Sequence, residues 1–261
     1  MFRITVLLAT LGAVPALAQT PPDVCAASTD KPGHMLVMGG SENRDALSEP
    51  QKQNLQKYGV EVGALIATYG ARYVVRSRPQ STVEGTWPAW KGVVISQWPC
   101  REAGQAFWHS EKYQNEVIPL RRGAATYRVG MFGAPPKHPE ETGQWTAEGG
   151  AAAKNVTCKV PVYLLVTAEA KDAAKLGAYR KALADSGIMY GYGAVDVLQG
   201  PPAEVLEGDW PATFSAKVTR WPCRAAFDAF YASADYNTKH KPLRANAADF
   251  TAVLVAEEKP R

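Results

Sequence analysis

The sequence lacks the short motifs that most directly indicate a reaction. No Gly-x-Ser-x-Gly segment, typical of a hydrolase nucleophile, is present. The run Gly39-Gly40-Ser41 lacks the rest of a phosphate-binding loop. The four histidines are scattered and no Cys-x-x-Cys pair occurs, so we expect no metal site and no cofactor. Without these motifs, the sequence does not indicate which reaction, if any, the protein catalyses.

An excess of one charge is also missing. The chain has 29 basic and 25 acidic residues, and its Lys and Arg residues are scattered along the sequence. A nucleic-acid surface needs a basic stripe or patch. We therefore predict no nucleic-acid partner.

Long hydrophobic runs are absent except for a short one at the start. A basic Met1-Phe2-Arg3 precedes the apolar run Ile4–Val14 and then Ala16-Leu17-Ala18. This order is typical of a secretory signal peptide, and the run is shorter than the about 20 residues that span a bilayer. We predict a signal peptide at residues 1–18, no membrane span, and a periplasmic or secreted protein. The alternative is an uncleaved N-terminal anchor.

An internal repeat organises the rest of the chain. Residues 69–125 match residues 192–248 without a gap, with 24 identities in 57 positions. Upstream of Tyr69 the match continues after a two-residue shift. Two copies are too few for a solenoid, so we interpret the chain as a fused pseudo-dimer and expect a monomer with internal pseudo-two-fold symmetry.

Both copies predict the same order of elements. In the second copy, strands are expected near residues 162–166, 195–198, 216–219 and 250–255, with helices through Tyr179 and after Arg224. A loop is expected over residues 201–208. The first copy predicts strands at 35–38, 72–76, 93–96 and 127–132, with equivalent helices.

Strand-helix-strand-strand-helix-strand is the ferredoxin-like order. We predict an α+β protein of two tandem ferredoxin-like repeats, residues 19–133 and 158–261. A Pro- and Gly-containing linker at 134–157 would join them. Because helices cover only one face of each sheet, the two sheets should pack face to face as a pseudo-dimeric α/β barrel.

The four cysteines allow three disulfide pairings. In the predicted sheet, the first and third strands of a repeat are antiparallel neighbours, so the start of one lies beside the end of the other. Cys25 and Cys158 precede first strands, whereas Cys100 and Cys223 follow third strands. We therefore predict Cys25–Cys100 and Cys158–Cys223 bonds, which an exported protein permits.

Several segments together resemble the DUF 1330 family of small ferredoxin-like proteins. They are Tyr69-Gly70-Ala71-Arg72-Tyr73-Val74-Val75-Arg76, Glu84-Gly85-x-Trp87-Pro88, Phe107-Trp108-His109-Ser110-Glu111-x-Tyr113 and Pro119-Leu120-Arg121, with counterparts in the second copy. The resemblance covers both repeats and implies sheet-to-sheet pairing, as in dimeric α/β-barrel proteins. It implies no reaction.

Candidate site residues concentrate in the first repeat, because the second repeat replaces several of them. Arg72 and Arg76 become Val195 and Gln199, and His109 becomes Ala232.

Arg72 and Arg76 alternate with Val74, so we expect both guanidinium groups on one face of a strand, as a clamp for an anion. The alternative is an ion-paired strand end, with Glu84 as a candidate partner. His109 is a weak candidate for an acid or base, the alternative being an ordinary surface histidine. Trp87, Trp108 and Tyr113 are candidate ligand-binding aromatics, with core packing as the alternative.

Two functions follow from these residues. The first is an exported protein that binds a small anionic or aromatic molecule in its first repeat, which a pocket lined by both arginines would support. The second is a non-catalytic structural or protein-interaction module, which a filled barrel with a large exposed apolar patch would support.

Overall fold

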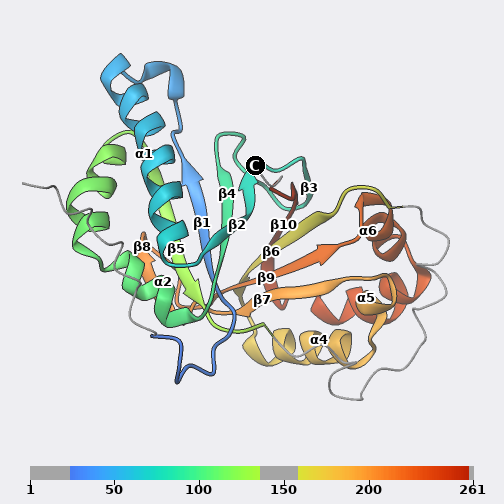
Figure 1. Ribbon diagram of the computed structural model, residues 1–261. Coiled ribbons are helices and arrows are strands. Elements are labelled where there is room, and N and C mark those ends of the chain that lie inside the picture. The colour runs from blue at the N-terminus through green and yellow to red at the C-terminus, as the bar shows by residue number, and fades with distance from the viewer. Residues whose placement is uncertain (1–23, 136–157, 259–261) are drawn as a thin grey trace, which may run out of the picture.

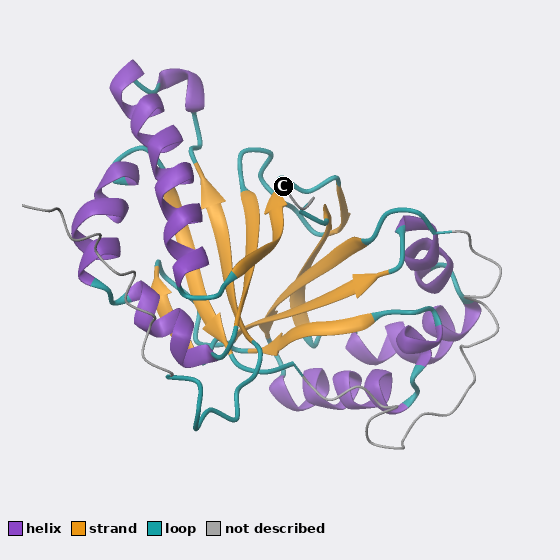
Figure 2. Cartoon of the chain, in the orientation of Figure 1, coloured by secondary structure: helices purple, strands orange, loops and turns teal. Residues whose placement is uncertain are grey.

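The computed structural model describes residues 24–135 and 158–258. The predicted signal peptide and most of the predicted linker lie outside these residues. No helix in the described ranges is long and apolar enough to cross a membrane. The chain builds two antiparallel sheets that face each other, with helices on their outer faces (Figure 1, Figure 2).

The first repeat supplies five strands and two α-helices. These are β1 (Gly33–Gly40), α1 (Glu49–Thr68), β2 (Arg72–Ser77), β3 (Ser81–Glu84), β4 (Gly92–Trp98), α2 (Arg101–Trp108) and β5 (Thr126–Phe132). Short helical segments are η1 (Arg44–Ala46), η2 (Tyr113–Val117) and η3 (Ile118–Arg121).

The second repeat has the same order, with its first helix divided in two. Its elements are β6 (Val162–Ala170), α4 (Ala173–Asp185), α5 (Ile188–Gly191), β7 (Val195–Gly200), β8 (Glu204–Glu207), β9 (Phe214–Trp221), α6 (Arg224–Tyr231), η6 (Tyr236–His240), η7 (Lys241–Arg244) and β10 (Ala248–Ala256). Ser186 and Gly187 separate α4 from α5, and Gly187 has a φ of 63°. This interruption explains the two-residue shift between the copies.

The predicted helices and strands are confirmed, as is the sheet-to-sheet packing. The core between the sheets draws on both repeats. Leu36, Val75 and Ile95 from one sheet meet Leu165 and Val218 from the other, and all five are fully buried. The space between the sheets is therefore packed with side chains.

One prediction about the second repeat is wrong. Residues 204–207 form strand β8 rather than part of a loop, and β8 pairs with β5 of the first repeat. Reciprocally, β3 of the first repeat pairs with β10 of the second. In Figure 1 the orange β8 lies beside the green β5, among elements of the first repeat. The sheet orders are thus β2-β4-β1-β5-β8 and β3-β10-β6-β9-β7.

The disulfide prediction is confirmed. Cys25 bonds to Cys100 with Cα atoms 5.6 Å apart, and Cys158 bonds to Cys223 with Cα atoms 5.2 Å apart. The neighbouring first and third strands are β1 with β4 and β6 with β9, as expected. Each bond ties the start of a repeat to the end of its third strand.

The glycine that follows each exchanged strand has a specific steric role. Gly208 has a φ of +81°, and a Cβ atom there would lie 2.5 Å from the Tyr127 carbonyl oxygen. Gly85, with a φ of +71°, lies equally close to the Phe250 carbonyl oxygen. The recurrent Glu-Gly pair therefore reflects close approach of one repeat's backbone to the other.

We expect Gly208→Ala to lower the free energy of unfolding by about 3 kcal/mol, from left-handed strain plus a backbone clash. Gly123→Ala is the matched control, because Gly123 has a φ of +71° with open space around it. It should cost only about 1 kcal/mol. Equal losses for the two variants in urea unfolding would contradict the close approach of the two repeats.

Candidate functional site

Each repeat encloses a cavity between its helices and the outer face of its sheet. The repeat-one cavity has a volume of about 100 Å³ and lies below α1, facing β1, β2 and β4. The residues that line it include Tyr58, Tyr73, Arg76, Val94, Trp108, Tyr113 and Arg121. The repeat-two cavity, of about 80 Å³, is lined by equivalents such as Tyr179, Gln199, Lys217, Tyr231, Tyr236 and Arg244.

A pair of tyrosines and a buried ion pair recur beside both cavities. In the first repeat, the Tyr58 and Tyr113 hydroxyl oxygens are 3.2 Å apart. Arg121 is 5% exposed and donates from both terminal nitrogens to the Glu207 carboxylate, with Nη1 2.7 Å from Oε1. Its guanidinium carbon also lies 4.5 Å from the centre of the Tyr127 ring.

The second repeat has the same arrangement, but here the arginine comes from the second repeat and the carboxylate from the first. Arg244 pairs with Glu84 at 2.5 Å. Glu84 ends β3 and Glu207 ends β8, so each buried arginine meets a carboxylate carried by an exchanged strand. The sequence alone did not identify the partners of Arg121 and Arg244. The joint recurrence of Glu-Gly and Pro-Leu-Arg in both copies was the available signal.

Burial keeps the tyrosines of the first repeat protonated. It raises the pKa of Tyr58 well above its usual value and the pKa of Tyr73 to about 12. At neutral pH these groups are uncharged hydrogen-bonding hydroxyls, suited to orienting a ligand rather than to removing protons.

A wider opening, which we call the arginine cleft, adjoins the repeat-one cavity and has a volume of about 390 Å³. It is lined by Arg44, Arg76, Arg78, Trp90 and Tyr127, among others, and its lining within residues 24–135 and 158–258 includes no Asp or Glu. The cleft and the cavity share several lining residues, which are Val37, Tyr58, Arg76 and Val94.

Arg76 lies where the two spaces meet. Its Nη2 is 2.8 Å from Oε1 of Glu258, and its guanidinium lies 4.8 Å from the Tyr73 ring centre. It is thus ion-paired, though with Glu258 rather than with the Glu84 considered above. Trp108 and Tyr113 are buried in the same cavity wall. The structure therefore brings together three of the predicted site residues.

Arg72 lies elsewhere, and the prediction that it shares a face with Arg76 is wrong. The register between β2 and β4 shifts between Tyr73 and Val75. Arg72 lies opposite Gln97 and Arg76 opposite Val94. Because Gln97 and Val94 are three residues apart on one strand, the two arginines project on opposite faces. Arg72 donates to Gln97 Oε1 at 2.7 Å on the face toward the other sheet.

Trp87 and His109 also lie outside the cleft and the cavity. Trp87 packs against the core between the sheets, and its Nε1 donates to the Lys91 carbonyl at 2.7 Å. The His109 side chain is 62% exposed, with Nε2 3.1 Å from Oε1 of Glu204 on β8. In the described ranges, no group of three or more His, Cys, Asp or Glu residues is arranged to hold a metal ion.

Comparison with known proteins gives a family and a fold. A family model described as "Domain of unknown function (DUF1330)" matches residues 48–132 and 161–257. No curated protein sequence matches the chain.

Among solved structures, a variant of chlorite dismutase from Candidatus Nitrospira defluvii is 12% identical, with a TM-score of 0.50 over 89% of this chain and 93% of that chain. An anthrone oxidase-like protein is 15% identical, with a TM-score of 0.49 over 89% and 94% of the two chains. At such identities the first likeness shows a shared fold and no activity.

We expect Glu207→Gln to lower the free energy of unfolding by about 2 kcal/mol, because it leaves the buried Arg121 charge without its counter-charge. The half-exposed carboxylate keeps the loss below that of a fully buried pair. Glu84→Gln should cost a similar amount in the other repeat, whereas Glu111→Gln, at an exposed position, should cost little. Urea unfolding measures all three, and a neutral Glu207→Gln would show that the pair is not needed.

A separate pH dependence should come from His34, which is 2% exposed. Burial, together with the nearby Arg72 charge, lowers its pKa to about 4. The unfolded chain therefore binds the proton more readily, and stability should fall by about 3 kcal/mol as pH drops from about 6.5 to about 4. His34→Gln should flatten this part of the stability profile. His109→Gln, at an exposed site, should leave it steep, and a similar flattening by both would contradict the assignment.

Proposed function

The chain belongs to the DUF1330 family, a family of domains of unknown function, and we propose that its first repeat binds a small organic anion. The anionic group binds in the arginine cleft, and an aromatic or apolar body enters the repeat-one cavity. The observation that carries this proposal is the concentration of positive charge in a cleft whose lining, in the described part of the chain, has no acidic residue.

The charge in the cleft is available to a ligand. Arg44 and Arg78 are exposed, and neither has an ion-pair partner within residues 24–135 and 158–258. Arginine remains charged at every relevant pH and presents a planar fork that matches a carboxylate or phosphate. Arg76 is already paired with Glu258, so it contributes mainly at the junction with the cavity.

The second repeat lacks this charge. Gln199 and Pro201 stand where the first repeat has Arg76 and Arg78. The shared features of the two copies, the tyrosine pair and the buried ion pair, support the fold in both. The arginines therefore distinguish the first repeat as the anion site.

The ligand's compartment is also part of the proposal. Two disulfides in a chain of four cysteines suit an oxidising environment. Together with the predicted signal peptide, they support binding of a periplasmic or extracellular solute.

The test uses benzoate as the probe and its uncharged isostere benzamide as the control ligand. A ligand that binds only the native state raises the melting temperature. Benzoate should raise it and benzamide should not, and high salt should reduce the shift because the cleft is exposed. The Arg44→Gln/Arg78→Gln double variant should weaken benzoate binding about tenfold in titration calorimetry.

Arg122→Gln is the matched control, because Arg122 is an exposed arginine of the same repeat outside the cleft. Its benzoate affinity should equal that of the unmodified chain. Equal affinity of benzoate for the double variant and the unmodified chain would overturn the proposed site. So would a series of aromatic and aliphatic carboxylates none of which shifts the melting temperature.

A further inference from the structure

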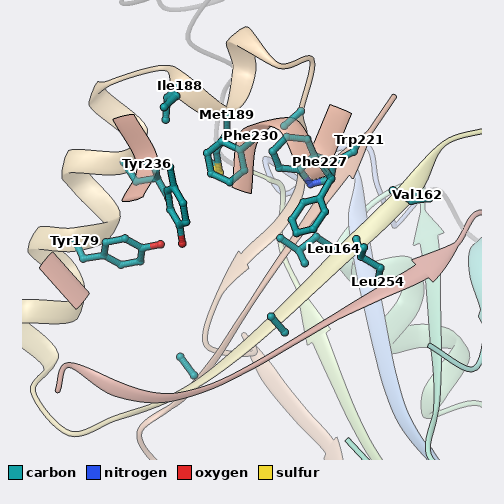
Figure 3. Packing of buried hydrophobic residues seen from close by; sticks show 14 of the residues in the cluster. Val162, Leu164, Tyr179, Ile188, Met189, Trp221, Phe227, Phe230, Tyr236 and Leu254 are labelled. Atoms are coloured by element: carbon teal, nitrogen blue, oxygen red, sulfur yellow. The ribbon is translucent and has the colours of Figure 1, made fainter. Parts of the chain in front are cut away.

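The repeat-two cavity is enclosed by aromatic and aliphatic side chains. Phe227, Phe230 and Tyr236 lie on one side, toward the helices, while Leu164 lies on the strand opposite them (Figure 3). Its volume of about 80 Å³ far exceeds the roughly 10–15 Å³ that one water molecule needs. The cavity therefore has room for more than a single water molecule, and its walls are mostly apolar.

The charged groups in this wall are already partnered. Lys217 Nζ is 2.7 Å from Asp196 Oδ1, and it also donates to Gln199 Oε1 at 2.7 Å. Arg180 donates to the Ser215 hydroxyl at 2.6 Å. Arg244 is held by Glu84 of the exchanged strand. Lys217 and Arg244 are thus neutralised by carboxylates, whereas Arg180 has only the neutral Ser215 hydroxyl as its stated partner. Because most of the remaining wall is apolar, an uncharged ligand fits the cavity.

Two tyrosine hydroxyl groups provide hydrogen-bonding positions in this mostly apolar cavity. Tyr179 on α4 and Tyr236 on η6 interact through their hydroxyls, which point toward each other in Figure 3. Burial raises the pKa of both groups, so they remain protonated and can donate or accept a hydrogen bond. A ring bearing a single hydroxyl fits this combination of apolar wall and paired hydroxyls.

The two cavities differ at the positions that would select a ligand. Gln199 stands at the position of Arg76. Lys217, which Asp196 neutralises, stands at the position of Val94. The repeat-two side therefore lacks equivalents of Arg76 and Arg78, and Arg180 is the cation of its described lining that has no carboxylate partner.

We propose that the repeat-two cavity is a second binding site, selective for a small uncharged aromatic alcohol or phenol. The Tyr179 and Tyr236 hydroxyls hydrogen-bond the ligand's hydroxyl, and the phenylalanine rings pack against its ring. This site is independent of the anion site in the first repeat.

The experiment titrates 4-fluorophenol into the oxidised full chain and follows the fluorine NMR signal. Binding should saturate at one equivalent. Tyr236→Phe should weaken it about five- to tenfold by removing one hydrogen bond. The same variant should change the affinity for fluorobenzene, which lacks a hydroxyl, less than about twofold.

Two controls separate this site from the first repeat. Tyr113→Phe removes the equivalent hydroxyl there, and Arg44→Gln/Arg78→Gln removes the cleft charge. Neither should change 4-fluorophenol affinity. A space-filling change, Ala184→Phe, should abolish binding while the chain stays folded by circular dichroism, because Ala184 lines the cavity at a half-buried position of α4.

Absence of saturable binding would overturn the proposal. Loss of binding in either control variant would also overturn it, by placing the phenol in the first repeat. Neither result would bear on benzoate binding, so the two sites fail or succeed separately.

Discussion

The reciprocal exchange of two short strands is the constraint on which the rest of the structure depends. Strands β3 and β8 each complete the sheet of the other repeat. Each exchanged strand ends in a glutamate that neutralises an arginine buried in the host repeat. Because a buried arginine without a counter-charge is strongly destabilising, neither repeat satisfies its own interior alone. The exchange also covers one sheet edge in each repeat, and an uncovered edge is a template for aggregation.

Because side chains fill the space between the sheets, the two cavities described above lie on the outer faces of the sheets. The two sheets pack fully buried side chains such as Val75, Leu165 and Val253 against one another. The cavities instead lie between helices and sheets, with a tyrosine pair in the lining of each. Of the large exposed apolar residues, Val60 lies in the first repeat, whereas Val160, Val195, Val205 and Leu243 lie in the second. The filled barrel fits an interaction module, but the charge of the arginine cleft favours ligand binding.

Much of this architecture was predictable from the sequence because it depends on local pattern. The ungapped repeat predicted two equivalent units, and strand neighbours within a unit then selected both disulfides among three pairings. The exchange was not predictable, because a four-residue strand flanked by Gly and Pro contains no information about its partner. The irregular register in β2 was equally hidden. One extra residue, Val74, reverses the alternation, so Arg72 and Arg76 separate although their spacing places them on one face of a regular strand.

Because the two repeats are fused in one chain, they can carry different substitutions, which the identical subunits of a homodimer cannot. In a symmetric dimer every substitution appears twice, so a change that suits one site alters the other as well. In the fused chain, Arg76 could become Gln199 in one copy while the other retained its charge. The features kept in both copies include those that the exchanged strands require: the buried arginine, its glutamate and the glycine beside it. The cavity linings differ at Arg76 and Val94, which Gln199 and Lys217 replace in the second copy. This division is expected if the scaffold constrains both repeats together while each cavity meets a separate chemical demand.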